Sequence, residues 1–378
     1  MRLPTWKPFC CVIAVAALIT GPIVVAVAGT PDEGFSPYWT EHSGVLYGEI
    51  DKGLYVAVDV ASGSTAWQFR DDRIVHFTKP EFADGVGFVA GATTDSESEL
   101  LRLNLRTGNP EWRTSFVNLA GNASSVVCGT SLLLHDFSSK VVVAFDTRTG
   151  GVQWRTDQIP YALMHPPVIF DNNRAMYLAL PRNEPNTAEL VTLECSSGHV
   201  TSTVHVSNIG LSRNPLLLTP QGLLRLGYEG PPSRTRLQMV ELDTFKERWS
   251  VSIPDDIARF TPCLSGDALV GGGSSIWVAD LASGKTRHRY RLPKPTVPIA
   301  VSRNRALFSW GDSGLAAYDI SSGHRLWVTQ LKGRITSNVT VAGERIIVAV
   351  DSRQLAVLGY SGQIEKYIDV VRHANGER

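Results

Sequence analysis

The chain has 378 residues and carries 36 Lys and Arg against 36 Asp and Glu, so its formal net charge at neutral pH is zero. This balance, together with the lack of any basic run, argues against nucleic acid as a partner. Hydrophobic residues make up 43% of the chain, and 33 Gly with 21 Pro are typical of a turn-rich β protein.

The first 30 residues have the pattern of a targeting segment. Arg2 and Lys7 precede an apolar run over 9–28, which is long enough to cross a bilayer of about 30 Å as an uncleaved helical anchor. The basic residues before the run place the N-terminus inside and the rest of the chain outside the cytoplasm. The alternative is a signal peptide cleaved after Ala28, which would leave a secreted or periplasmic protein.

A short phrase recurs along the rest of the chain. An apolar strand ends in Asp, Gly follows four residues later, and Trp follows four residues after the Gly. Full copies lie at 59–67, 146–154 and 319–327, and eroded copies at 104–112, 194–202, 242–249, 280–288 and 359–366. A phrase repeated at roughly 40–50 residues indicates one supersecondary unit copied many times, here eight times.

Each unit has the pattern of β structure. In the last unit, 335–342, 345–350, 354–358 and 364–370 are rich in β-branched residues and are separated by short turns. Four strands in each of eight units predict an all-β fold, an eight-bladed β-propeller of four-stranded antiparallel blades. The predicted propeller covers 36–372 and ends in a tail at 373–378.

The phrase predicts structural roles for its residues. Gly allows a turn conformation that other residues adopt at a steric cost, Asp locks the turn by hydrogen bonds to backbone N–H groups, and Trp offers a flat apolar face to the neighbouring blade. The residues expected in these roles are Asp59, Gly63, Trp67, Gly108, Trp112, Asp146, Gly150, Trp154, Trp249, Gly284, Asp319, Gly323 and Trp327.

The phrase resembles the PQQ-type propeller repeat, whose usual form is a strand followed by Asp-x-x-x-Gly-x-x-x-Trp. That family divides into quinoprotein dehydrogenases and non-catalytic relatives, and the size of this chain is similar to that of the BamB-like branch. The resemblance implies a scaffold that binds a protein or an envelope component. The alternatives are a small PQQ-dependent dehydrogenase and a sensor with a small ligand in the channel.

The resemblance also bears on cofactors. Quinoprotein dehydrogenases are typically longer, and many carry a vicinal disulfide over the quinone and a bound Ca²⁺. The only vicinal pair here, Cys10-Cys11, lies in the targeting segment. We therefore expect neither PQQ nor Ca²⁺, no catalytic residue, no metal ligand and no enzymatic activity.

Candidate partner-binding residues lie on the face that carries the connections between second and third strands and between blades. Three second-to-third connections are predicted to be long, 93–99, 181–189 and 227–236, and function is often carried on such loops. From these loops we select Asp95, Glu97, Glu99, Arg182, Tyr228 and Arg234.

The segments entering the first strands of four blades carry Arg on the same face, namely Arg73, Arg213, Arg259 and Arg334. These side chains are suited to bidentate contacts with an anionic partner or a lipid head group. The alternative is local ion pairing with acidic neighbours such as Asp71 and Asp255.

The exported part holds three cysteines, Cys128, Cys195 and Cys263, each in a different predicted blade. An odd and scattered count predicts no disulfide framework. Cys128 and Cys263 lie at similar places near the end of a first strand, where we expect small buried apolar residues.

Overall fold

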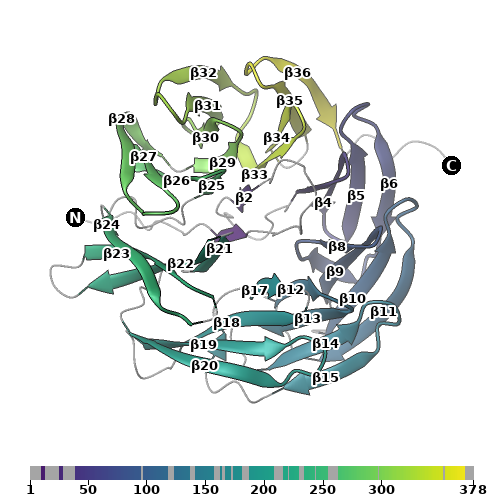
Figure 1. The fold of residues 1–378 in the computed structure, drawn as a ribbon. Coiled ribbons are helices and arrows are strands. Elements are labelled where there is room, and N and C mark those ends of the chain that lie inside the picture. The colour runs from purple at the N-terminus through teal and green to yellow at the C-terminus, as the bar shows by residue number, and fades with distance from the viewer. Residues whose placement is uncertain are drawn as a thin grey trace, which may run out of the picture. The chain divides into compact units, whose positions relative to one another are not determined.

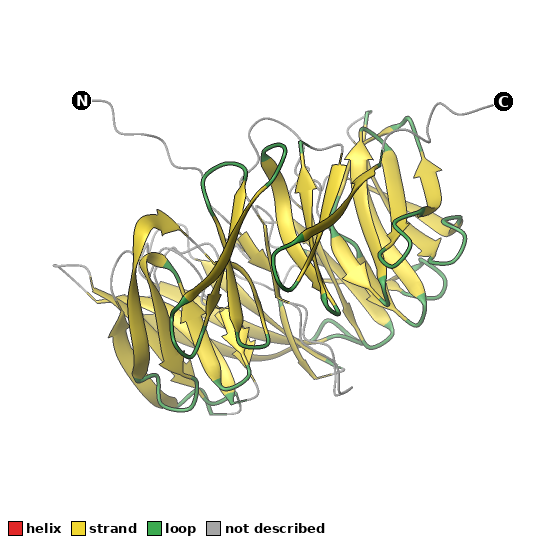
Figure 2. Ribbon diagram, turned by 90° about the horizontal axis from the view of Figure 1, so that it is seen from above, coloured by secondary structure: helices red, strands yellow, loops and turns green. Residues whose placement is uncertain are grey.

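The computed structural model describes residues 10–12, 25–28, 39–94, 97–117, 123–136, 141–156, 162–163, 167–171, 173–180, 187–207, 216–219, 221–229, 234–242, 244–253, 263–296, 298–351 and 354–370. These residues form antiparallel strands in eight sheets, the blades of an eight-bladed β-propeller (Figure 1). Figure 2 shows strands and loops and no helix in the described part. The predicted fold class is confirmed.

The chain divides into two compact units. The first, Tyr38–Gly210, holds blades one to four. Its strands are β3 (Thr40–His42), β4 (Val45–Asp51), β5 (Leu54–Asp59) and β6 (Thr65–Arg70) in blade one; β7 (Ile74–Phe77), β8 (Glu81–Ala83), β9 (Val86–Thr93), β10 (Glu97–Asn104) and β11 (Pro110–Val117) in blade two; β12 (Ala123–Cys128), β13 (Ser131–Asp136), β14 (Val142–Asp146) and β15 (Val152–Thr156) in blade three; and β16 (Ala162–Leu163), β17 (Val168–Asp171), β18 (Arg174–Leu180), β19 (Thr187–Glu194) and β20 (Val200–Ser207) in blade four.

The second unit, Leu211–Arg378 with Met1–Pro37, holds blades five to eight. Its strands are β21 (Leu216–Thr219), β22 (Gly222–Glu229), β23 (Arg234–Val240) and β24 (Glu247–Ile253) in blade five; β25 (Cys263–Ser265), β26 (Ala268–Gly271), β27 (Gly273–Asp280) and β28 (Thr286–Thr296) in blade six; β29 (Pro298–Ser302), β30 (Arg305–Ser309), β31 (Gly314–Asp319) and β32 (Arg325–Gln330) in blade seven; and β33 (Ile335–Ala342), β34 (Arg345–Val350), β35 (Gln354–Gly359) and β36 (Ile364–Asp369) in blade eight.

Within the N-terminal segment the structure describes two short strands, β1 (Cys10–Val12) and β2 (Val25–Ala28), which extend the sheet of blade seven through β29. The helix predicted over residues 1–30 is not shown, and most of this segment lies outside the described residues. Among the described residues, no helix has both the length and the apolar character needed to cross a membrane.

The repeated Trp closes the seam between successive blades. The Trp67 indole lies against Gly108 of the next blade, where a Cβ would come within 2.5 Å of the ring, and its N–H donates to the carbonyl of Leu105 at 2.7 Å. Gly108 has φ +74°, so the turn conformation and the approach of the ring both favour glycine. The same packing joins Trp112 to Gly150, Trp154 to Gly198, Trp249 to Gly284 and Trp327 to Gly362.

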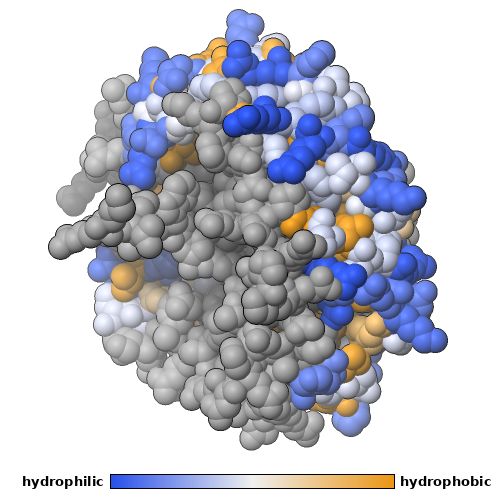
Figure 3. All heavy atoms as spheres, turned by 90° about the vertical axis from the view of Figure 1, so that its left-hand side faces the viewer, coloured by the Kyte–Doolittle hydropathy of each residue, from blue (hydrophilic) through white to orange (hydrophobic). Residues whose placement is uncertain are grey.

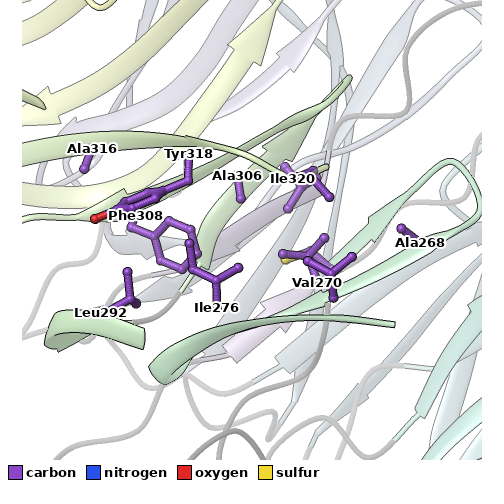
Figure 4. Close-up of a cluster of buried hydrophobic side chains, with 12 residues drawn as sticks. Ala268, Val270, Ile276, Leu292, Ala306, Phe308, Ala316, Tyr318 and Ile320 are labelled. Atoms are coloured by element: carbon purple, nitrogen blue, oxygen red, sulfur yellow. The ribbon is translucent and has the colours of Figure 1, made fainter. Parts of the chain in front are cut away.

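Blade six closes its seam differently because His288 stands at the Trp position. Tyr290, two residues further along β28, packs on Gly323 of blade seven and donates its hydroxyl to the carbonyl of Ser321 at 3.2 Å. His288 stacks on Tyr290 with ring centroids 5.6 Å apart. Beneath them, buried aliphatic and aromatic side chains of blades six and seven fill the space between the two sheets (Figure 4).

The acidic residue of the phrase locks its turn, as the sequence suggests. Asp146 Oδ1 accepts hydrogen bonds from the backbone N–H groups of Arg148 and Thr149 at 3.0 and 2.7 Å. These bonds and the Thr149 hydroxyl hold the pKa of Asp146 below its usual value. Asp59 and Asp319 accept equivalent bonds from Ser62 and Ser322.

The cysteine prediction was wrong in one respect. Cys128, at the end of β12, and Cys195, directly after β19, form a disulfide that joins blades three and four across 67 residues of sequence. Both cysteines lie where a strand reaches the face that carries the repeated Asp-to-Gly turns, and their Cα atoms are 6.0 Å apart. Cys263 is a free and fully buried cysteine, as expected.

Candidate functional site

We call the face that carries the second-to-third connections and the blade-to-blade connections the loop face. Two of the predicted Arg residues occupy equivalent backbone sites on it. The carbonyl of Arg73 accepts a hydrogen bond from Thr94 N–H at 2.9 Å, and the carbonyl of Arg334 accepts one from Asp351 N–H at the same distance. Each of these Arg residues therefore ties a blade-to-blade connection to a second-to-third turn.

At Arg73 the loop face carries a cluster of four charged side chains that joins blades one and two. Arg73 Nη2 lies 2.9 Å from Asp71 Oδ2, and Arg73 Nη1 lies 3.0 Å from Glu99 Oε1. Arg113, from the outer strand β11, contacts both carboxylates, at 3.4 Å from Glu99 Oε2 and closer to Asp71. The Arg113 guanidinium also stacks over the Phe69 ring at 5.5 Å. We call Asp71, Arg73, Glu99 and Arg113 the loop-face cluster.

The cluster has buried anions and exposed cations. Both carboxylate side chains are 9% exposed, whereas the Arg73 side chain is 59% exposed. Hydrogen bonds from Arg73 foremost, together with Arg113, hold the pKa of Asp71 well below its usual range, although burial opposes this shift. The low pKa keeps Asp71 ionised at neutral pH, and the cluster presents the Arg73 guanidinium to solvent.

The low pKa of Asp71 predicts a pH dependence of stability. A carboxyl group with a depressed pKa in the folded state stabilises the fold above its unfolded value of about 4, and this contribution disappears as the pH falls through the folded pKa. We expect Asp71→Asn to lower the free energy of unfolding by about 1–2 kcal/mol at pH 7, because the partner guanidinium groups are partly solvated. Denaturant unfolding at several pH values should show this difference shrinking below about pH 4. A difference that is constant with pH would contradict the role given to Asp71.

Arg334 is held through hydrogen bonds of its main chain. Its backbone N–H donates to Asp351 Oδ1 at 2.8 Å, and the N–H of the following Ile335 donates to the carbonyl of Asp312 at 2.9 Å. The Arg334 main chain is thus fixed in blade eight, within the other unit of the chain.

The remaining candidates lie partly in strands and partly outside the described residues. Strands continue into all three predicted long loops. Glu97 and Glu99 belong to β10, Tyr228 belongs to β22, and Arg234 begins β23 opposite Glu229. In the loop predicted at 181–189, β19 begins at Thr187. These connections are shorter than the sequence suggested, because the antiparallel pairing persists to the tip of each hairpin. The candidates Arg213, Arg259, Asp95 and Arg182 lie outside the described residues.

Two charged residues make contacts that the sequence did not predict. Arg113 belongs to the loop-face cluster although it lies 42 residues from Asp71. Glu49, in strand β4, is buried between blades one and two, where its Oε2 lies 2.7 Å from His76 Nδ1 and accepts the Phe77 N–H at 3.1 Å. The sequence signal was a charged residue at a second-strand position where blade two has Ala90 and blade eight has Ala349, although blade three has the polar His135 there.

The described residues contain no group of three or more His, Cys, Asp or Glu side chains arranged to hold a metal ion. The absence of PQQ and Ca²⁺ remains an expectation from the sequence.

The repeat and the propeller geometry have counterparts among known proteins. The family model described as outer membrane protein assembly factor BamB matches residues 26–161 and 233–376, in both units of the chain. No curated protein sequence matches the chain significantly.

Among solved structures, BamB from Moraxella catarrhalis is similar over 89% of this chain and 97% of its own, with 15% identity and a TM-score of 0.61. Dihydro-heme d1 dehydrogenase NirN in complex with DHE is similar over 97% of this chain and 80% of its own, with 14% identity and a TM-score of 0.62. Quinohemoprotein alcohol dehydrogenase from Comamonas testosteroni is similar over 83% of this chain and 70% of its own, with 12% identity and a TM-score of 0.55. At these identities the likeness concerns the fold alone.

Proposed function

This chain belongs to the family of outer membrane protein assembly factor BamB, and on that premise we propose that it is a non-catalytic, extracytoplasmic propeller scaffold. In this proposal the loop face binds a protein or another component of the cell envelope. The observation that carries the proposal is the family match, which extends over blades of both units.

The loop-face cluster supports the choice of face. Two buried carboxylates hold Arg73 in place from one side, and its guanidinium remains 59% exposed. A fixed and solvated guanidinium needs little ordering when a partner's carboxylate or phosphate meets it. Asp72, which is 82% exposed beside it, pairs with Arg70 at 3.1 Å, so the same edge offers charges of both signs.

The proposed localisation rests on two features. The apolar run at 9–28 is suited to a membrane anchor with the propeller outside the cytoplasm. The Cys128–Cys195 disulfide suits an oxidising compartment, where such bonds persist.

A quinoprotein-type dehydrogenase is the second candidate, because a quinohemoprotein alcohol dehydrogenase is among the similar structures. It makes a distinct prediction, namely that the purified chain takes up pyrroloquinoline quinone and Ca²⁺ in stoichiometric amounts and reduces dye acceptors.

The scaffold proposal predicts contact at the loop face in the native membrane. A photo-cross-linking amino acid at Asp72, on the loop face, is expected to give a discrete adduct with one envelope protein. The matched control is Arg106, an exposed residue of a blade-two turn on the opposite face, at which we expect no such adduct. Adding Arg73→Glu to the Asp72 variant should reduce the adduct at least five-fold.

Equal adducts at positions 72 and 106 would contradict the choice of face. Absence of an adduct at position 72 together with stoichiometric quinone uptake would favour the enzyme over the scaffold.

A further inference from the structure

The outer strand of blade six, β28, is the most basic of the described strands. It carries Arg287, Arg289, Arg291 and Lys294 and no acidic residue. None of the other seven outer strands, β6, β11, β15, β20, β24, β32 and β36, holds more than one Lys or Arg. The repeat therefore does not require basic side chains at this strand, and blade six departs from its own pattern.

The arginines of β28 lie on the outer rim of the blade (Figure 1). Arg289 and Arg291 are both exposed and are two residues apart, so they lie on the same side of the strand at a spacing of about 7 Å. Arg289 Nε donates to Ser275 Oγ, a neutral partner, at 2.9 Å. Tyr290, between them, points to the other side, where it packs on Gly323 of blade seven. Two guanidinium groups are thus presented in a row to solvent.

Blade six has too few acidic residues to neutralise this strand. Residues 263–296 hold 5 Lys and Arg against 2 Asp, a net charge of +3. Both acidic residues, Asp267 and Asp280, contact Arg287. Arg291 and Lys285 are exposed and form no ion pair among the described residues. The rim of blade six therefore keeps a positive charge at its surface.

The next outer strand, β32 of blade seven, adds exposed aliphatic side chains to this rim. Leu326 and Val328 are 44% and 39% exposed, and with Val152 they are the exposed large hydrophobic residues in the part of the chain that the structure describes. Figure 3 shows a described surface on which hydrophilic side chains predominate and apolar patches are small. β32 begins with the exposed Arg325 and contains no acidic residue, so it continues the basic character of β28.

This combination of side chains identifies the kind of partner. Pro293 and Pro295 in β28 lack backbone donors, and arginines protect a strand edge, so the partner is bound by side chains and not by strand addition. A soluble acidic chain would account for the arginines alone. An anionic bilayer surface accounts for both features, because its phosphates attract arginines and its head-group region accepts aliphatic side chains.

The distribution of charge along the chain agrees with such a surface. The unit that contains blades five to eight holds 24 Lys and Arg against 17 Asp and Glu, a net charge of +7, whereas Tyr38–Gly210 holds 12 against 19, a net charge of −7. The neutral whole chain hides this asymmetry, and the basic strand lies in the basic unit.

We propose that the outer rim of blades six and seven docks on a bilayer surface that contains anionic phospholipids. Arg289 and Arg291 contact lipid phosphates, while Leu326 and Val328 enter the head-group region. This inference rests on the proposed membrane localisation, because a membrane anchor would hold the rim close to the bilayer at a high effective concentration. The docking surface is distinct from the loop face.

The test reconstitutes the full chain into phosphatidylcholine vesicles with or without phosphatidylglycerol. A photo-cross-linking amino acid at Val328 is expected to form lipid adducts, with a yield at least ten-fold higher when phosphatidylglycerol is present. The matched control is Gln68, which is exposed at the same repeat position in blade one and should give no lipid adduct. Raising NaCl from about 50 mM to about 500 mM should remove most of the adduct, because salt screens exposed charges.

Two variants of the cross-linking chain locate the charge. Arg289→Gln/Arg291→Gln should lower the lipid adduct at position 328 at least ten-fold. Arg106→Gln/Arg155→Gln removes the same charge at exposed positions of the other unit, with Arg155 aligned to Arg289, and should leave the yield unchanged. Thermal melting followed by circular dichroism checks that both variants fold.

Equal yields with and without phosphatidylglycerol, equal yields at positions 328 and 68, or a yield that Arg289→Gln/Arg291→Gln leaves unchanged would overturn the proposal. A protein adduct in place of the lipid adduct at position 328 in the native membrane would identify an acidic protein as the occupant and would overturn it as well.

Flotation with pure phosphatidylcholine vesicles tests the proposed localisation separately. A chain that floats but gives no lipid adduct at position 328 keeps its anchor and loses the docking rim. A chain that does not float but gives adducts that depend on phosphatidylglycerol keeps the docking rim and loses the anchor.

Discussion

Trp154→Ala should lower the free energy of unfolding by about 3–5 kcal/mol, the range for removing a large aromatic side chain from a packed site. The indole packs on Gly198 and donates its N–H to the carbonyl of Cys195 at 2.8 Å. The substitution leaves a cavity in the seam between blades three and four and removes the partner of that carbonyl. Chemical denaturation followed by circular dichroism measures the effect.

The chain supplies its own control for this result. Ser202 stands at the Trp position of blade four, so Ser202→Ala should change the free energy of unfolding by less than about 0.5 kcal/mol. The substitution Gly198→Ala changes the other side of the same seam, because it would place a Cβ atom 2.5 Å from the Trp154 indole. A Trp154→Ala variant that kept its stability but lost a binding activity would place this Trp in a ligand site.

Removing the disulfide should have a comparable effect. For Cys128→Ser/Cys195→Ser we expect a loss of about 4 kcal/mol, because the bond closes a loop of 67 residues and restricts the unfolded chain. The wild type should melt at a lower temperature in a reducing buffer, and the double variant should melt at the same temperature in both buffers. A wild-type protein prepared under oxidising conditions and denatured without reductant should then expose one reactive thiol in residues 39–370, that of Cys263.

If three thiols react instead, the bond is absent in solution. In that case the support that the disulfide gives to an oxidising compartment disappears as well.

Much of the fold could be predicted because the information is local and repeated. The four strands expected in blade eight agree with β33 to β36 to within one residue at each end. The roles of Asp, Gly and Trp follow from turn geometry and aromatic packing, which the chain shows several times over. The number of blades follows from the spacing of the glycines together with Trp249, which marks the one copy without the Gly.

What could not be predicted depends on contacts between blades. Cys128 and Cys195 come together because blades three and four are neighbours and both residues lie at the same face, and neither fact is written in the spacing of cysteines. Arg113 reaches Asp71 for the same reason. The limits of the hairpin loops at Glu97 and Arg234 depend on how far strand pairing continues. The polar residues at a hairpin tip do not indicate where this pairing stops.

The seams also give the array of blades a direction. In every described example the aromatic side chain belongs to the earlier blade and the glycine that receives it belongs to the later one, as for Trp67 with Gly108 and Trp327 with Gly362. Within one unit, cutting the chain after a blade therefore leaves an uncovered indole, whereas cutting before a blade leaves only an uncovered glycine turn. A C-terminal truncation between blades should consequently create the more aggregation-prone fragment, and a fragment that begins at a later blade should be the more soluble one.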